Sequence, residues 1–338
     1  MSKLKHITTR KGQPMSQGSA QRAWVAGRDL TRRLPLLIGI ASILILFGLL
    51  EPRILSLANL RNIAVQTSYL ALFAMAQTMV ILVRGFDLSL GFTVSLVSVL
   101  ASMAMVGMGG SDLAIPLGLA AGLLVALAVG LVNGLLIAQI GINPLVTTLG
   151  MANIIMALAS TVSNGFPVTG APAGFTAIFA QGSLAGLPAV IWITAAVFLA
   201  LYVTLRATRF GRSLYILGSN PRAARAAGIR VMPVLTLAYA LCGALAGIGA
   251  LLLTARTGSG EPNLGGNLTL ESIAAAVVGG VRLTGGEGGV GAALLGALFV
   301  TVLSNGMNLL QVDGYLQQVC LGAIILISLI ISRGETRA

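Results

Sequence analysis

The chain has 338 residues, of which 56% are apolar and only 9% are charged. A soluble domain carries about a quarter of charged residues, so this composition excludes one and indicates a membrane protein. The net charge of +12 does not indicate a nucleic-acid partner, because every lysine lies in the N-terminal tail and the arginines flank hydrophobic runs, as orientation signals do.

The N-terminal stretch is basic and polar, and a long apolar run follows it. That run, residues 34–50, ends in Glu51-Pro52 rather than in a small-residue cleavage site, so it is not typical of a secretory signal peptide. We therefore expect residues 1–33 to form a retained and largely disordered cytoplasmic tail.

Apolar runs of membrane-spanning length continue through the rest of the chain. A bilayer core about 30 Å thick requires about 20 apolar residues per helix. The run 268–281 is short and carries Glu271, so it either spans the membrane or is re-entrant. The sequence predicts an all-α polytopic membrane protein with about ten transmembrane helices, at residues 34–50, 62–83, 88–111, 115–140, 145–161, 189–205, 231–255, 268–281, 288–312 and 316–331.

The positions of the basic residues predict the orientation. If the N-terminus is inside, most lysines and arginines fall in the tail and in the loop 206–230, and few fall on the outer side. This distribution follows the positive-inside rule. We expect both termini to be cytoplasmic, with a transmembrane domain over residues 34–331, its cytoplasmic loop at 206–230, and a C-terminal tail over 332–338.

Residue types that catalysis or metal binding needs are scarce. The single histidine is His6, in the tail, and Cys242 and Cys320 lie in apolar runs where thiols usually pack as small hydrophobic groups. We expect no catalytic residue, no metal, no cofactor and no disulfide. Glycine pairs four residues apart favour a tightly packed helix bundle: Gly118–Gly122, Gly130–Gly134 and Gly243–Gly247.

The loop 206–230 is the longest polar segment between two predicted spans. Asn220-Pro221 is typical of a helix start, with asparagine as the N-cap and proline at the first helical position. We expect a short helix over residues 221–227 that Gly228 ends. Its arginines either anchor to anionic headgroups or form a docking element for a cytoplasmic subunit.

The segment 84–91 places a carboxylate between two apolar spans. Asp87 either pairs with Arg84 or caps the start of the next span, or it contributes to a transport pathway. Polar residues within the spans default to hydrogen bonds between helices, and some could line a solute path: Gln77, Asn133, Thr147, Thr148, Asn153, Asn305, Asn308 and Gln311.

The glycine-rich segment 279–291 resembles a phosphate-binding loop in composition only. A P-loop needs a lysine after its last glycine, and the chain has no lysine beyond Lys11. We expect a tight cytoplasmic turn where backbones cross closely, and no ATP hydrolysis by this chain through a P-loop.

Several separated segments together resemble one family, the ribose-type (monosaccharide) permeases of bacterial ABC importers. The resemblance extends from about residue 34 to residue 331. The segments that carry it are VILVRGFDLSLG (80–91), NGFPVT (164–169), TRFGRSLYILGSNPRAARAAGI (208–229), ESIAAAVVGG (271–280) and NGMNLL (305–310). Phe86 stands where the family favours an aliphatic residue, and Arg84 is a departure that relatives often lack.

This resemblance implies a type II ABC importer-like helical bundle in the bacterial inner membrane, with no catalytic activity of its own. It implies three partners: a cytoplasmic ABC ATPase, a periplasmic substrate-binding protein, and a second permease copy as a homodimer or a close paralogue. On the positions that match the family, it implies an ATPase-coupling segment made of Gly218, Ser219, Asn220, Pro221, Ala223, Ala224, Gly228 and Ile229. A second set is expected in the translocation pathway or in structural turns: Gly85, Phe86, Asp87, Ser89, Gly91, Asn164, Asn305 and Asn308.

The sequence is thus interpreted as the permease subunit of an importer that carries a pentose, a hexose or a similar polar solute, driven by a separate ATPase. The alternative is a stand-alone secondary transporter of a small polar solute, but the few charges within the spans argue against proton or sodium coupling. A membrane enzyme would need a nucleophile–base pair or metal cluster that the sequence does not offer.

Overall fold

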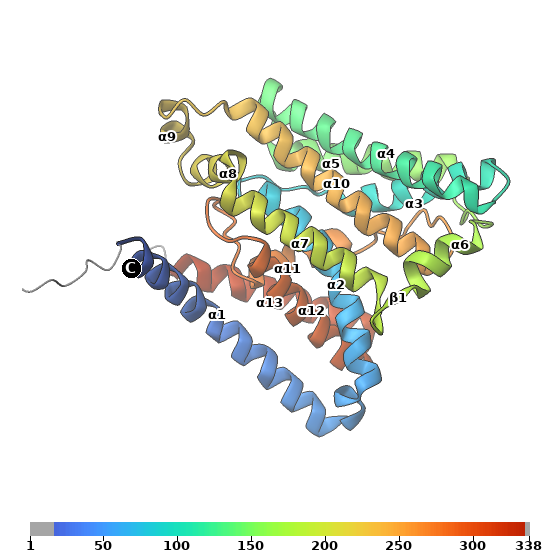
Figure 1. The fold of residues 1–338 in the computed structure, drawn as a ribbon, viewed down its shortest axis with the longest axis horizontal. Coiled ribbons are helices and arrows are strands. Elements are labelled where there is room, and N and C mark those ends of the chain that lie inside the picture. The colour runs from blue at the N-terminus through green and yellow to red at the C-terminus, as the bar shows by residue number, and fades with distance from the viewer. Residues whose placement is uncertain (1–16, 335–338) are drawn as a thin grey trace, which may run out of the picture.

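The computed structural model describes the backbone of residues 17–334, with the side chains of residues 34–327 and 330. Nearly all of this part of the chain is helical (Figure 1). The first half consists of α1 Gln17–Leu50, η1 Pro52–Leu55, α2 Leu57–Ile81, α3 Leu90–Gly107, η2 Asp112–Ala114, α4 Ile115–Leu135, η3 Leu136–Ile140 and α5 Pro144–Val162. The second half consists of α6 Ala173–Thr176, η4 Ala177–Gln181, the hairpin β1 Ser183–Leu184 with β2 Leu187–Pro188, α7 Ala189–Ala207, α8 Arg209–Ser219, α9 Pro221–Ala226, α10 Val231–Thr257, α11 Leu268–Val278, α12 Val290–Leu309 and α13 Gly314–Gly334.

Seven of the described helices are long and apolar enough to cross a membrane. Three shorter apolar helices accompany them, at Leu34–Leu50, Leu268–Val278 and Gly314–Ile327. Each predicted span corresponds to one of these helices, so the prediction of an all-helical polytopic protein is confirmed.

The N-terminal tail differs from the expectation. We expected residues up to Arg33 to be largely disordered, whereas α1 begins at Gln17 and continues without a break to Leu50. The segment 17–33 is rich in alanine, glutamine and arginine, which favour helix, and it adjoins a span that is already helical. Residues 1–16 lie outside the described part of the chain.

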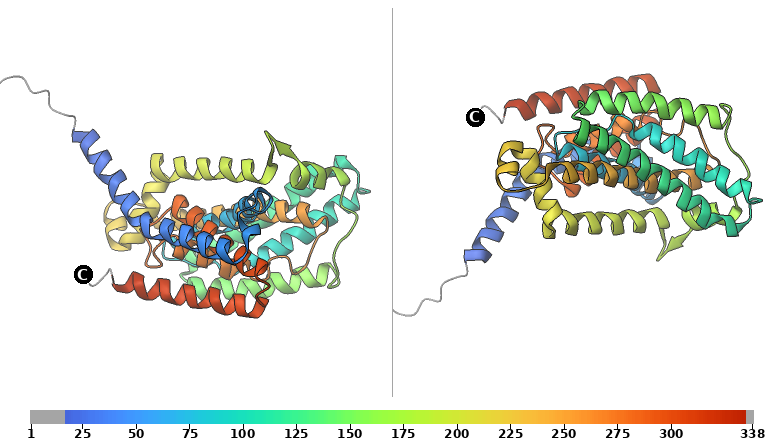
Figure 2. Two further views of the ribbon diagram at one scale, coloured as in Figure 1. Left: turned by 90° about the horizontal axis from the view of Figure 1, so that it is seen from below. Right: turned by 90° about the horizontal axis from the view of Figure 1, so that it is seen from above.

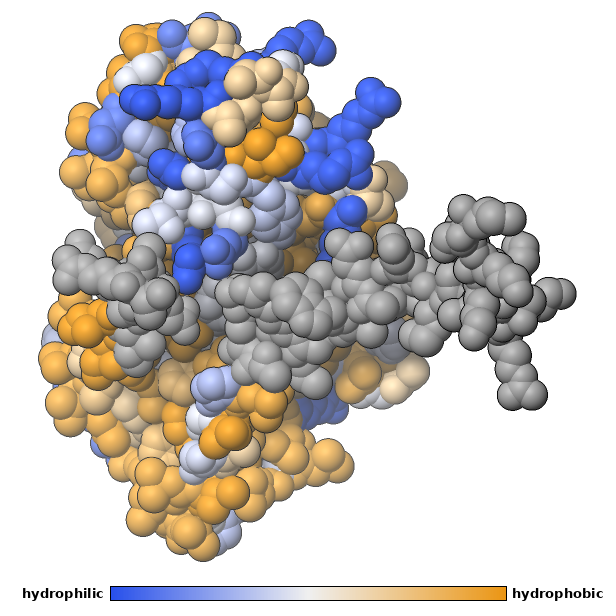
Figure 3. All heavy atoms as spheres, turned by 90° about the vertical axis from the view of Figure 1, so that its left-hand side faces the viewer, coloured by the Kyte–Doolittle hydropathy of each residue, from blue (hydrophilic) through white to orange (hydrophobic). Residues whose placement is uncertain are grey.

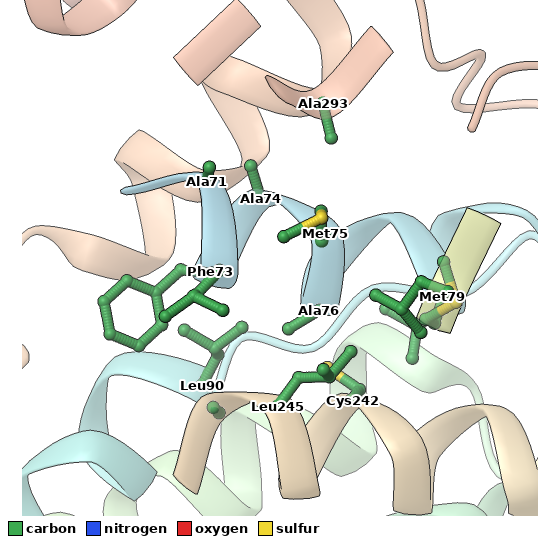
Figure 4. Packing of buried hydrophobic residues seen from close by; sticks show 14 of the residues in the cluster. Ala71, Phe73, Ala74, Met75, Ala76, Met79, Leu90, Cys242, Leu245 and Ala293 are labelled. Atoms are coloured by element: carbon green, nitrogen blue, oxygen red, sulfur yellow. The ribbon is translucent and has the colours of Figure 1, made fainter. Parts of the chain in front are cut away.

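Helix α2 lies at the centre of the bundle. It packs against α10, α11, α12 and α7, and all of residues 67–83 are buried. Its alanine, methionine and phenylalanine side chains point to every side, and Cys242 and Leu245 of α10 meet them across one of these contacts (Figure 4). An apolar helix in a membrane can face lipid or protein, so it is the packing of four helices around α2 that makes it the core.

The peripheral helices cover this core from two sides. Helix α7 lies on one face, while α5 and α13 lie on the opposite face (Figure 2). The described chain begins and ends at the same end of the molecule, which is also the end where α8 and α9 lie (Figures 1 and 2).

Helices α4 and α10 cross at their glycines. A Cβ atom on Gly243 would overlap the carbonyl oxygen of Ala126 and would lie 3.1 Å from the Cα of Gly130. The two backbones therefore touch at this crossing, and the predicted close packing through small residues is confirmed.

A non-helical segment, residues 258–267, runs beside α3 before α11 begins. Its backbone donates hydrogen bonds to serines of α3, from Glu261 N to Ser98 Oγ (3.0 Å) and from Gly265 N to Ser95 Oγ (3.0 Å). A non-helical backbone within a bundle needs such partners, because lipid supplies none. The predicted eighth span is thus the short helix α11 joined to a non-helical stretch, since 11 helical residues are only about 16 Å long.

Candidate coupling site

The segment between α7 and α10 folds into two short helices. Helix α8 begins after Thr208, whose hydroxyl accepts a hydrogen bond from Gly211 N (3.1 Å). The side chain of Asn220 then begins α9, because its Oδ1 accepts from the backbone N–H groups of Arg222 (3.0 Å) and Ala223 (3.1 Å). Pro221 occupies the first helical position, where the lack of an N–H costs nothing.

Helix α9 ends in a Schellman motif. Ile229 N donates to Ala224 O, and Gly228 N donates to Arg225 O, both at 3.0 Å. Gly228 has φ +75°, a left-handed conformation that favours glycine. The predicted start at Asn220-Pro221 and the predicted end at Gly228 are both confirmed.

Helix α8 was not predicted from the sequence. Its signals were present, since Thr208 is a good N-cap and Phe210, Leu214 and Leu217 recur at helical spacing. The arginines between these apolar residues are more typical of a polar loop, so the sequence pattern did not indicate a helix.

The surface around α8 and α9 is strongly basic. All arginines of the segment 206–230 are exposed: Arg206, Arg209, Arg212, Arg222, Arg225 and Arg230. Hydrophilic side chains gather at this end of the molecule, above a largely apolar body (Figure 3). One side of the short helices is nevertheless anchored, because Leu214 and Ala224 are fully buried.

The turn between α2 and α3 holds a buried carboxylate. Asp87 Oδ1 accepts from the backbone N–H of Ser89 (2.9 Å) and from its hydroxyl, just before α3 begins. Asp87 therefore holds Ser89, the residue that precedes the first turn of α3, but it does not itself cap the helix. The alternative pairing with Arg84 is wrong, because the Arg84 guanidinium donates instead to the carbonyl oxygens of Gly218 and Ser219.

Neighbouring helices hold the Asp87 turn in place. Asn133 Nδ2 donates to Ser89 Oγ (2.9 Å), and the hydroxyl of Tyr239 donates to Phe86 O (3.2 Å). Cys242 Sγ lies 3.8 Å from the second carboxylate oxygen. Burial raises the pKa of the Asp87 carboxyl above its ordinary value, while the hydrogen bonds from Ser89 act in the opposite direction.

The remaining pathway candidates lie elsewhere. Asn164 is exposed at the end of α5, with φ +53°. Asn305 exchanges two hydrogen bonds with Asn59 of α2, and Asn308 accepts from Gln317 Nε2 (2.9 Å). The structure therefore does not gather the predicted pathway residues into one cluster.

The glycine-rich segment between α11 and α12 is a turn packed against α2 and α8. Gly286 N donates to Leu82 O (3.0 Å), and the hydroxyl of Tyr215 donates to Gly288 O (2.9 Å). Arg282 and Glu287 form an ion pair across the turn (3.0 Å). The expected close crossing of backbones is confirmed.

The structure is an all-helical polytopic bundle with two short basic helices between two spans, and comparison with known proteins identifies its family. Residues 59–329 match the family described as "Branched-chain amino acid transport system / permease component", and the chain belongs to this family. No solved structure matches the chain.

Curated relatives cover most of the chain. The ribose import permease protein RbsC of Escherichia coli (strain K12) is 35% identical over 301 residues, which are 87% of this chain and 92% of that protein. RbsC of Bacillus subtilis (strain 168) is 34% identical over 300 residues, covering 88% and 92%. The galactose/methyl galactoside import permease protein MglC of Escherichia coli (strain K12) is 35% identical over 291 residues, covering 82% and 86%.

The chain is therefore a multi-pass membrane permease component of a bacterial ABC importer, and it is not itself an enzyme. A component of this kind works with an ATPase and a substrate-binding protein.

Proposed function

We propose that this chain forms the pore through which a monosaccharide, a pentose or a hexose, crosses the inner membrane, and that its ATPase docks on residues 218–229. The observation that carries the docking site is α9. A short helix capped at both ends, flanked by exposed arginines, presents a rigid surface between two spans.

The positions of the chain ends support a cytoplasmic location for this surface. α9 lies at the end of the molecule shared by Gln17 and Gly334, and most basic residues of the sequence belong to segments at that end. The positive-inside rule assigns such an end to the cytoplasm, where an ATPase is accessible. The binding protein then meets the opposite end.

The nature of the solute is inferred from relatives. The similar proteins are named for ribose and for galactose or methyl galactoside, so a pentose or hexose is the class that this chain is proposed to carry. We further propose that two permease copies, or this chain and a close paralogue, together enclose the pore.

Reconstitution tests the docking site. The chain is placed in proteoliposomes with its ATPase and binding protein, and residues 220–224 are replaced by a Gly/Ser linker of equal length. We expect ATP-dependent sugar uptake and ATPase co-purification to be lost. As the matched control, residues 107–111 at the far end are replaced in the same way, and ATPase co-purification should persist. Uptake that survives the 220–224 replacement unchanged contradicts the proposal.

A further inference from the structure

Arg84 joins the last turn of α2 to the coupling segment. Its Nε donates to the carbonyl oxygen of Gly218, and its Nη2 donates to that of Ser219 (2.6 Å). These carbonyls belong to the last two residues of α8, immediately before Asn220 begins α9. We propose that Arg84 is a positioning residue that transmits movement of the docked coupling segment to the central helix α2.

The chemistry of the contact suits a mechanical link. The last carbonyls of a helix have no partner within the helix and carry partial negative charge. A guanidinium offers several donors in a rigid plane, so one side chain can hold two carbonyls at a fixed angle. A lysine ammonium is a point charge on a flexible stem and would hold them less firmly.

The backbones around this contact are closely packed. A Cβ atom on Gly218 would overlap the carbonyl oxygen of Leu82, and that same carbonyl accepts from Gly286 N. The ends of α2 and α8 and the glycine-rich turn therefore meet at one junction. A shift of α8 toward the bundle must displace Leu82 as well.

The conformation of Arg84 supports a role for its side chain. Its φ is +65°, in the left-handed region that non-glycine residues adopt at a cost, and Gly85 follows directly. Glycine would fit the backbone at position 84 without strain. Arginine therefore does not stabilise the backbone conformation at this position. Its side chain, however, makes the contact with α8.

The receiving helix is the one most able to spread a movement. Residues 67–83 of α2 are buried on all sides, and α2 packs directly against α10, α11 and α12. Close-packed interiors transmit displacement rather than absorb it. Arg84 thus lies between the surface where the ATPase is proposed to dock and the helices that pack against α2.

This inference rests on the proposed docking site, so the test measures docking and coupling separately. Permease variants are reconstituted with the ATPase, the binding protein and a transported sugar. Three quantities are recorded: the ATPase that co-purifies, the ATP hydrolysed, and the sugar taken up per ATP. The variants are Arg84→Gly, Arg84→Ala and Arg84→Lys, with Arg53→Ala as control. Arg53 is an exposed arginine at the far end, paired with Glu51 (2.8 Å).

We expect Arg84→Gly and Arg84→Ala to retain the wild-type amount of ATPase but to lower sugar uptake per ATP about fivefold or more. Arg84→Lys should recover part of the loss, and Arg53→Ala should match the wild type in the amount of ATPase that co-purifies. The thermal unfolding midpoint of each variant in detergent shows that the bundle is intact. Arg84→Gly also removes the backbone strain, so its loss of coupling isolates the side chain.

Wild-type uptake per ATP in Arg84→Gly overturns the inference alone and leaves the docking proposal standing. A loss of bound ATPase in proportion to the loss of uptake also overturns it, because Arg84 would then only support the docking surface. A wild-type chain that binds no ATPase overturns both proposals.

Discussion

Single residues at chain reversals determine the local geometry of the coupling region. Asn220 begins α9, Gly228 ends it, and Asp87 fixes the approach to α3. Each uses a property of its own side chain, either a short acceptor that reaches the next N–H groups or the absence of a Cβ. The junction at Gly218 depends on the same principle, since only a residue without a Cβ lets α8 touch α2.

Replacing Gly218 by alanine should separate α8 from α2. The added methyl group overlaps the carbonyl of Leu82, and the obstructing atoms are backbone, which cannot rotate away. We expect the variant to be destabilised by about 1–3 kcal/mol and to lose sugar uptake more than ATPase binding. Thermal unfolding in detergent and uptake assays check this. Gly107→Ala is the control, because its Cβ would meet no atom within 4 Å.

At the scale of elements, the non-helical stretch 258–267 is held by hydrogen bonds to side chains of neighbouring helices. Ser98 is its main anchor, since its Oγ accepts from Glu261 N and also from the hydroxyl of Thr254 (2.8 Å). Helix α11 follows this segment directly, and Thr269 Oγ1 in its first turn accepts a hydrogen bond from Gly91 N (2.9 Å). The beginnings of α3 and α11 are thereby tied together.

Ser98→Ala should destabilise this arrangement. It leaves the partly buried backbone N–H of Glu261 without its acceptor, which costs up to about 1–3 kcal/mol. Ser102→Ala, one turn further along α3, is a matched control, because the Ser102 hydroxyl is buried with no hydrogen-bond partner. Its removal should be neutral or stabilising. Equal losses of the unfolding midpoint in the two variants would contradict the anchoring role of Ser98.

At the scale of the whole molecule, the bundle has two chemically different ends. One carries α8, α9 and both ends of the described chain, and the other carries the turn between α3 and α4. From the asymmetry of basic residues and the positive-inside rule, we propose that the first end faces the cytoplasm.

Cysteine labelling checks that assignment. Ser111 and Ala226 are exposed at opposite ends, and the Ser111 side chain makes no capping hydrogen bond. We expect a membrane-impermeant maleimide to label Ser111→Cys in intact spheroplasts, while Ala226→Cys is labelled only after lysis. The native Cys242 and Cys320 are replaced in this background. Labelling of Ala226→Cys before lysis would reverse the orientation.

The energy source also belongs to this scale. Uptake by the assembled complex should persist when an uncoupler abolishes the membrane potential and proton gradient, and it should stop when ATP is withheld. The opposite result, with uptake by this chain alone, would identify a secondary transporter instead.

The sequence by itself determined the apolar segments and the capped helix α9. A bilayer core demands long apolar helices whatever surrounds them, and the caps at Asn220 and Gly228 act within a few residues of themselves. These features are local in the chain, and they can therefore be inferred from composition and spacing.

Only the tertiary structure decided the partners of Arg84 and the path of residues 258–267. Spacing along the chain suggested that Arg84 pairs with Asp87, but the left-handed turn at Arg84 directs its side chain to Ser219, 135 positions away. The acceptors for Glu261 and Gly265 likewise lie on another helix. Such contacts depend on how the helices pack in space. The residues next to Arg84, Glu261 or Gly265 in the chain do not indicate which distant segment each will contact.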